Sequence, residues 1–127
     1  MDVKAPARTA TVLVAVRSPQ VREALAALIG SFIGFRVVGE AATDEQAIQI
    51  AQTERPRVAI VDEELAGATL GSTIQTLHEQ ALVEGVVAIG ARADGARRAQ
   101  AAGACSYLQI GASPADILDA LNTALST

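Results

Sequence analysis

The alternation of short apolar runs with longer helical patterns is the feature that most restricts how this chain can fold. Five runs rich in Val, Ile, Leu and Ala have the length and composition of buried strands, and each is followed by a segment with helical signals. The expected strands are 11–16, 35–41, 58–61, 86–90 and 105–110. Strands that are apolar on both faces require a parallel sheet covered by helices on both sides. The sequence therefore predicts a doubly wound α/β sandwich of five strands and five helices.

Helix start signals stand between the expected strands. Serine followed by proline, at residues 18–19 and again at 113–114, places a capping hydroxyl before a proline in the first helical position. Residues 43–46 have the capping-box pattern, with acidic side chains at the positive end of the expected helix. Gly30 or Gly34 is expected to end the first helix.

Length and composition favour one ordinary domain. The chain has 127 residues, a formal net charge of −4 and 50% hydrophobic residues. We expect residues 1–10 to be a flexible leader and residues 11–127 to form a single domain. No apolar run approaches the ~20 residues of a membrane span, and residues 1–10 lack a signal-peptide core. These features predict a cytoplasmic protein with no membrane partner.

Several site classes are disfavoured by the residues available. One cysteine, Cys105, and one histidine, His78, cannot build a Cys/His metal site. We expect Cys105 to be a small buried hydrophobe and His78 to face solvent on a helix. An acidic balance and few aromatic residues argue against direct nucleic-acid binding. The turn at residues 16–19 has no glycine, so no nucleotide cofactor is expected.

The carboxyl ends of the strands are where chemistry is expected in such a sheet. Those positions are Val16-Arg17, Asp62, Gly90-Ala91 and Ile110. Glu63 and Glu64 follow Asp62 and suggest a hard-cation site, since Mg²⁺ prefers carboxylate oxygens. Consecutive side chains diverge, however, and seldom converge on one ion.

From Thr11 to Leu125 the chain resembles the receiver domains of bacterial two-component response regulators, the CheY-like superfamily. The resemblance is carried by VLVAVRSPQVREALAALI, FRVVGEAATDEQAIQIAQTERPRVAIVDEEL and AAGACSYLQIGASPADILDAL. The resemblance is strongest to receivers that precede a helix-turn-helix output domain. No such output domain is expected in this sequence, which reaches Thr127 in the final helix of the receiver. The resemblance implies a flavodoxin-like receiver fold with strand order 2-1-3-4-5.

The resemblance also assigns roles to single positions. Asp62 matches the aspartate that accepts a phosphoryl group in this family, and Tyr107 falls on its aromatic switch position. The other active-site positions depart from the family pattern. Val16 and Arg17 replace an acidic pair that helps to hold Mg²⁺, Gly90 replaces a Ser or Thr, and Ile110 replaces a lysine.

These departures remove the groups that phosphoryl transfer requires, because the reaction depends on metal and cationic groups that neutralise oxygen charge. We expect Mg²⁺ to bind weakly or not at all, and no side chain to act catalytically. Arg17 is expected either to form an ion pair with Asp62, in place of the metal, or to point into solvent.

The sequence thus favours a degenerate pseudo-receiver that acts by phosphorylation-independent protein–protein interaction. The alternative is a genuine phosphorelay receiver in which Asp62 still accepts phosphate at a degenerate metal site, and an enzyme on the same fold is a third possibility. The expected partner is a signalling protein or a second copy of the chain.

Two surfaces are candidates for that partner. Arg92, Arg97 and Arg98 lie around the fourth helix and form either a solvated face or an interaction surface. The acidic side chains available nearby as opposite charges are Asp94, Asp116 and Asp119. The other surface is the first helix, whose small side chains allow close packing: Ala24, Ala26 and Ala27.

Overall fold

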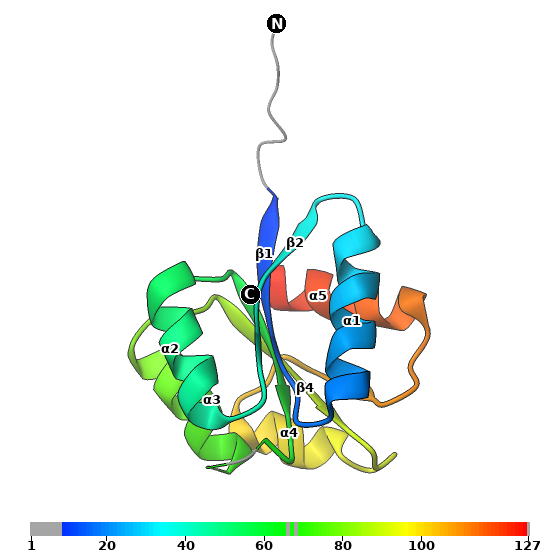
Figure 1. The fold of residues 1–127 in the computed structure, drawn as a ribbon. Helices are drawn as coiled ribbons and strands as arrows, with labels where there is room; N and C mark the ends of the chain where they lie inside the picture. Colours follow the sequence, from blue (N-terminus) through cyan, green and yellow to red (C-terminus); the bar gives the residue numbers. More distant parts are fainter. Residues whose placement is uncertain (1–8, 66, 68, 127) are drawn as a thin grey trace, which may run out of the picture.

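Strands and helices alternate along the whole of the computed structural model, which describes residues 9–65, 67 and 69–126 (Figure 1). The elements are β1 (Ala10–Ala15), α1 (Pro19–Ser31), β2 (Phe35–Ala41), α2 (Asp44–Glu54), β3 (Val58–Asp62), α3 (Leu70–Glu79), β4 (Gly85–Gly90), α4 (Ala96–Ala102), β5 (Ser106–Gln109) and α5 (Pro114–Leu125). The strands are parallel in the order β2-β1-β3-β4-β5. The doubly wound fold and its strand order are therefore confirmed.

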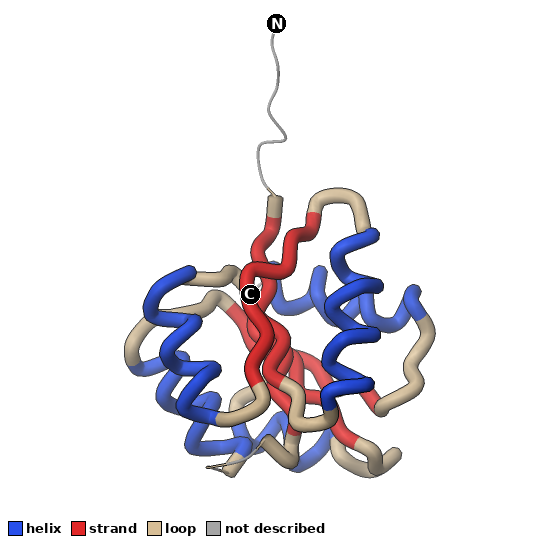
Figure 2. The backbone as a smooth tube through the Cα atoms, viewed as in Figure 1, coloured by secondary structure: helices blue, strands red, loops and turns tan. Residues whose placement is uncertain are grey.

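The two faces of the sheet carry separate cores because successive strand side chains point to opposite faces. In β1, Val12 and Val14 join the core beneath α1 and α5, whereas Leu13 and Ala15 join the core beneath α2, α3 and α4. Figure 2 shows these two helical layers flanking the strands. All four of these side chains are fully buried, as the strand composition predicts.

The predicted helix starts are confirmed by their capping bonds. The hydroxyls of Ser18 and Ser113 each accept a hydrogen bond from a backbone N–H in the first turn of α1 and α5. Thr43 does the same at α2, where its hydroxyl accepts from the N–H of Gln46. The Gln46 side chain accepts from the N–H of Ala42 rather than that of Thr43, so the capping box is shifted by one residue.

Some predicted boundaries are wrong by a few residues. Neither expected glycine ends α1, because Gly30 lies inside the helix and Gly34, with φ of +88°, lies in the turn that follows Ser31. β1 begins at Ala10, which was expected to belong to the leader, and the leader's residues 1–8 lie outside the described residues. β5 spans four residues rather than six, because the register with β4 covers only those positions.

Parallel pairing brings the carboxyl ends of the strands to one edge of the sheet. Ala15 pairs with Val61, and Asp62 pairs with Ile89, so the ends of β1, β3 and β4 are adjacent. The residues that follow these strands therefore surround a common crevice. No helix within the described residues is both long and apolar enough to span a lipid bilayer.

Candidate functional site

Asp62 is the last residue of β3 and is buried, with 5% of its surface exposed. One carboxylate oxygen, Oδ2, accepts a hydrogen bond of 2.9 Å from the backbone N–H of Arg17. The other, Oδ1, accepts one of 2.9 Å from the backbone N–H of Glu64. The carboxylate thus ties the end of β1 to the loop that follows β3, and each of its oxygens has a donor from the main chain.

A crevice of about 440 Å³ opens beside Asp62. Its lining residues are Arg17, Ser18, Pro19, Asp62, Glu64, Ala91 and Ile110. The structure therefore brings four of the predicted strand-end positions to one place: Arg17, Asp62, Ala91 and Ile110.

The two other predicted positions face elsewhere. Val16 is fully buried, and its side chain packs in the core beneath α1 and α5. Gly90 is buried at the end of β4, where it faces Glu63 and Tyr107. Ile110 is 41% exposed, so the crevice has an aliphatic wall where the family pattern has a lysine.

Of the two arrangements expected for Arg17, the structure shows the side chain in solvent and not the ion pair with Asp62. The Arg17 side chain is exposed, and in the described part of the chain no ion pair within 4.0 Å joins its guanidinium to the Asp62 carboxylate. The backbone N–H of Arg17 donates to Asp62 instead. The contact between Arg17 and Asp62 is thus made by the peptide group, while the guanidinium is exposed to solvent.

The donors at the crevice do not fit the magnesium ion that the receiver resemblance implies. Mg²⁺ requires several oxygen ligands in near-octahedral order, and neither Val16 nor Arg17 supplies a side-chain oxygen. Glu63 turns toward α4, while Glu64 is exposed. Among residues 9–65, 67 and 69–126 no three His, Cys, Asp or Glu side chains are grouped to hold a metal.

Glu63 forms a second cluster at the same edge of the sheet, in contacts with α4 and β5 that the sequence did not indicate. Its backbone N–H donates to the carbonyl of Ile89, and its Oε1 accepts a hydrogen bond of 2.7 Å from the guanidinium of Arg98 on α4. The single hydroxyl proton of Tyr107 is shared between two acceptors, the carbonyl of Arg92 at 2.5 Å and the other Glu63 oxygen, Oε2, at 3.3 Å. Only 14% of the Glu63 side chain is exposed.

Tyr107 is therefore held toward the sheet, at the end of β4. Burial raises the pKa of its phenol, and the negative charge of Glu63 and the hydrogen bond to it raise that pKa further. A glycine in place of a hydroxyl residue at position 90 was the sequence signal for this cluster, since a Cβ there would overlap the Glu63 carboxylate.

Two of the three arginines of the predicted interaction surface are paired within the chain. Arg92 forms a bidentate pair with Asp94, at 2.9 and 3.0 Å, and this hydrogen bonding lowers the pKa of the Asp94 carboxyl. Arg98 pairs with Glu63 and approaches Asp94 at 3.9 Å. Arg97 is exposed, and its side chain has no hydrogen bond or ion pair within the described residues.

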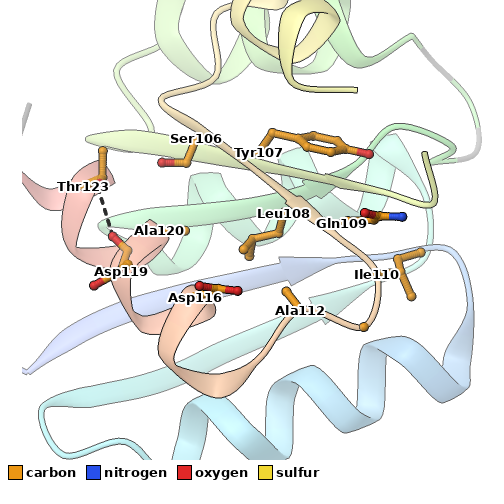
Figure 3. A pocket seen from close by; sticks show the side chains of 11 residues that line it. Ser106, Tyr107, Leu108, Gln109, Ile110, Ala112, Asp116, Asp119, Ala120 and Thr123 are labelled. Carbon is orange, nitrogen blue, oxygen red and sulfur yellow. Dashed lines mark hydrogen bonds between the residues drawn. The ribbon is translucent and has the colours of Figure 1, made fainter. Parts of the chain in front are cut away.

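A groove of about 590 Å³ runs along β5 on the α5 side (Figure 3). Asp116 and Asp119 of α5 line one wall of it and are exposed. Tyr107 and Leu108 leave β5 on opposite faces, because Leu108 belongs to the core beneath α5 and Tyr107 packs against the other core. β5 is the edge strand of the sheet, so one side of its backbone has no strand neighbour in the described sheet.

The two other singled-out residues lie away from the crevice. His78 is exposed on α3, as expected. Cys105 is partly rather than fully buried, and it packs against the core beneath α1 and α5.

Comparison with known proteins places this architecture among receiver domains. No protein-family model matches the chain. A curated relative, the transcriptional activator protein ExaE of Pseudomonas putida, is 31% identical over 110 residues, which are 85% of this chain and 51% of that protein. The chain thus spans about half the length of the relative it matches.

Solved structures agree in fold at low sequence identity. The signal receiver domain of the response regulator NarL from Mycobacterium tuberculosis superposes with a TM-score of 0.84 at 20% identity, covering 94% of this chain and 98% of that one. The response regulator domain of CheB from Thermotoga maritima gives 0.82 at 21% identity, with coverage of 94% and 98%. A LuxR-family two-component response regulator from Aurantimonas sp. gives 0.81 at 24% identity, with coverage of 93% and 86%. The chain therefore has the receiver fold.

Proposed function

We propose that this chain, which has the fold of response-regulator receiver domains, is a pseudo-receiver of bacterial two-component signalling that acts by phosphorylation-independent protein–protein recognition. The observation that carries the proposal is the hydrogen bonding of the Asp62 carboxylate. Each oxygen of its carboxylate accepts a backbone N–H, from Arg17 and from Glu64. At the position that corresponds to the phosphoacceptor, the carboxylate thus has a structural role, because it joins the backbone after β1 to the loop after β3.

The surroundings of Asp62 support this proposal because they lack the means to stabilise a transferring phosphoryl group. That reaction depends on positioning and on charge neutralisation by a metal and by cationic or hydroxyl groups. At the corresponding strand ends this chain has the aliphatic Val16 and Ile110 and the bare backbone of Gly90. Arg17 lines the crevice, but its guanidinium does not form an ion pair with Asp62.

The partner we propose is a signalling protein or a second copy of the chain, bound at the face formed by α4, β5 and α5. Arg97 on α4 offers a positive charge that is unpaired within the described residues, and Asp116 and Asp119 on α5 offer negative charges. Opposite charges on the two sides of one strand suit a two-fold contact, in which α4 of each copy meets α5 of the other. The curated relative is by name a transcriptional activator, and we propose a partner in transcriptional control for this chain too.

Nuclear magnetic resonance titration tests the loss of phosphoryl chemistry. We expect Mg²⁺, alone and with beryllium fluoride, to cause no saturable shifts of the backbone amides around Asp62. The Asp62→Asn variant is the control for nonspecific binding, because it lacks the carboxylate and keeps the side-chain shape. Saturable, magnesium-dependent shifts centred on Asp62 and absent from the variant would identify a working phosphorelay receiver and contradict the proposal.

A further inference from the structure

The cluster around Glu63 has the composition of an oxyanion site. A guanidinium and a phenolic hydroxyl converge on one carboxylate, with 2.7 Å from Arg98 Nη2 to Oε1 and 3.3 Å from the Tyr107 hydroxyl to Oε2. The hydroxyl shares its one proton with the carbonyl of Arg92, at 2.5 Å, so Arg98 provides the stronger of the two contacts to Glu63. Charge-assisted hydrogen bonds of this kind are among the stronger ones in proteins. The donors come from α4 and β5, whereas the carboxylate comes from the loop after β3, so three elements meet at one anion.

The backbone around this site leaves room for the anion and for the aromatic ring. A Cβ on Gly90 would overlap Oε2 of Glu63, and a Cβ on Gly95 would overlap the ring of Tyr107. Both glycines have negative φ, so their positions are explained by these close approaches and not by backbone conformation. The hydrogen bond from the Glu63 N–H to the Ile89 carbonyl holds the main chain of this residue against β4.

We infer that Glu63 is an oxyanion ligand supplied by the chain itself, which fills a site made by Arg98, Tyr107 and the open space at Gly90. Together with the carbonyl of Arg92 it holds Tyr107 toward the sheet. The site would accept other small carboxylates or oxyanions once Glu63 is removed. The inference rests on the proposed function only for its consequence, which is that the α4–β5 face is kept in one arrangement without phosphorylation.

The charged groups that face the Tyr107 hydroxyl make its ionisation a direct measure of this contact. Glu63 comes from the loop after β3, Arg92 from the loop before α4, and Arg98 from α4. The charge of Glu63 raises the pKa of Tyr107, whereas the charge of Arg98 lowers it. Removing the two groups one at a time should therefore shift this pKa in opposite directions.

Tyrosinate absorption of the full chain provides the test, because the sequence has one tyrosine and no tryptophan. In Glu63→Gln, which keeps the side-chain shape, the pKa of Tyr107 should fall, and in Arg98→Gln it should rise. Glu54→Gln makes the same charge change at an exposed end of α2, where the side chain has no hydrogen bond or ion pair within the described residues, and should titrate as wild type. Equal titration curves for Glu63→Gln and wild type would overturn the inference.

Chemical rescue provides a second readout. In Glu63→Ala the near-ultraviolet circular dichroism of Tyr107 should change, and added formate should restore it in a saturable way, whereas chloride at equal ionic strength should not. A dichroism spectrum that Glu63→Ala leaves unchanged would count against the site. If Glu63→Ala fails to fold, Glu63→Gln still decides the matter. These tests do not depend on Asp62, so magnesium-dependent shifts at Asp62 would refute the proposed function and leave this site in place.

Discussion

A missing Cβ at residue 90 determines where the Glu63 carboxylate lies. Glycine here gives Oε2 of Glu63 direct access to the end of β4 and places it beside the Tyr107 hydroxyl. The atoms that a larger residue would displace are the end of the flexible Glu63 side chain and the Tyr107 hydroxyl, and none of them belongs to the backbone. A substitution at Gly90 should therefore disrupt the contacts of Glu63 while the protein still folds.

We predict that Gly90→Ala folds but expels Glu63 from its site. The free energy of unfolding should fall by roughly 1.5–3 kcal/mol, the range for hydrogen bonds to a charged group. The near-ultraviolet dichroism of Tyr107 should change as well. Urea unfolding and dichroism measure both effects.

The matched control for this prediction is Gly30→Ala. Gly30 lies in α1, where a Cβ would have no atom within 4 Å. Alanine there should stabilise the helix by up to about 1 kcal/mol, since it is the better helix former. Equal stability and equal Tyr107 spectra for Gly90→Ala and wild type would show that Glu63 does not depend on the space at residue 90.

At the scale of elements, α4 is the helix that depends most on contacts with the rest of the molecule. It has seven residues, and Gly95 at its N-cap provides no side-chain hydrogen bond. Short isolated helices are unstable in water, so packing must hold this one. Ala99 is buried against the core, and Arg98 is anchored by Glu63. This leaves Arg97 as the arginine of α4 that is available to a partner.

We predict that Arg97→Glu weakens self-association or partner capture through the α4–β5–α5 face. Exposed charge pairs contribute about 0.2–1 kcal/mol, so a weakening of up to about fivefold per contact is expected. Analytical ultracentrifugation and pull-down assays measure it. Arg36→Glu makes the same charge reversal at an exposed position of β2, the opposite edge of the sheet, and should leave binding unchanged. If the two variants bind alike, this face is not the contact surface.

The order and type of the elements could be predicted because each depends on short-range signals. Apolar runs mark the strands, and Ser18, Thr43 and Ser113 mark helix starts through capping bonds that form within one turn. The end of α1 could not be predicted from glycine alone, since the helix continues through Gly30 to Ser31. Helix ends depend on tertiary packing as well as on local conformation.

The candidate site was predicted in part, for a similar reason. The positions around Asp62 follow from the ends of strands, which the pattern locates. The Glu63–Arg98 ion pair joins residues 35 positions apart, and no local signal specifies such a contact. The sequence left two alternatives for Arg17, because it indicates a charge next to the crevice but not whether the side chain or the peptide N–H faces Asp62. The structure shows the second alternative, in which the side chain is in solvent and the N–H donates to Asp62.

At the scale of the whole molecule, the ionisation of Tyr107 is linked to folding. Its pKa in the folded state is raised, first by burial and then by Glu63. The folded state therefore holds the phenolic proton more tightly than the unfolded state, where the pKa is about 10. By linkage, this contribution to stability is complete below that pH and is lost as pH rises through the folded-state pKa.

We predict that Tyr107→Phe reduces the loss of stability in the alkaline range. Phenylalanine keeps the ring but has no ionisable group, so above pH about 10 its free energy of unfolding should fall less steeply than that of wild type. Urea unfolding at a series of pH values gives the two slopes. Parallel slopes would mean that Tyr107 ionises alike in both states.

The overlap between a Cβ at residue 90 and the Glu63 carboxylate also restricts the order in which this sequence can change. A serine or threonine at residue 90 meets Glu63 as long as that side chain keeps its place, whereas the same replacement is free of this clash once residue 63 has become small. The effect of either substitution thus depends on the other. A hydroxyl residue that arises first at residue 90 must displace the Glu63 side chain, whereas one that arises after the loss of Glu63 does not, so the contact favours one order of the two substitutions over its reverse.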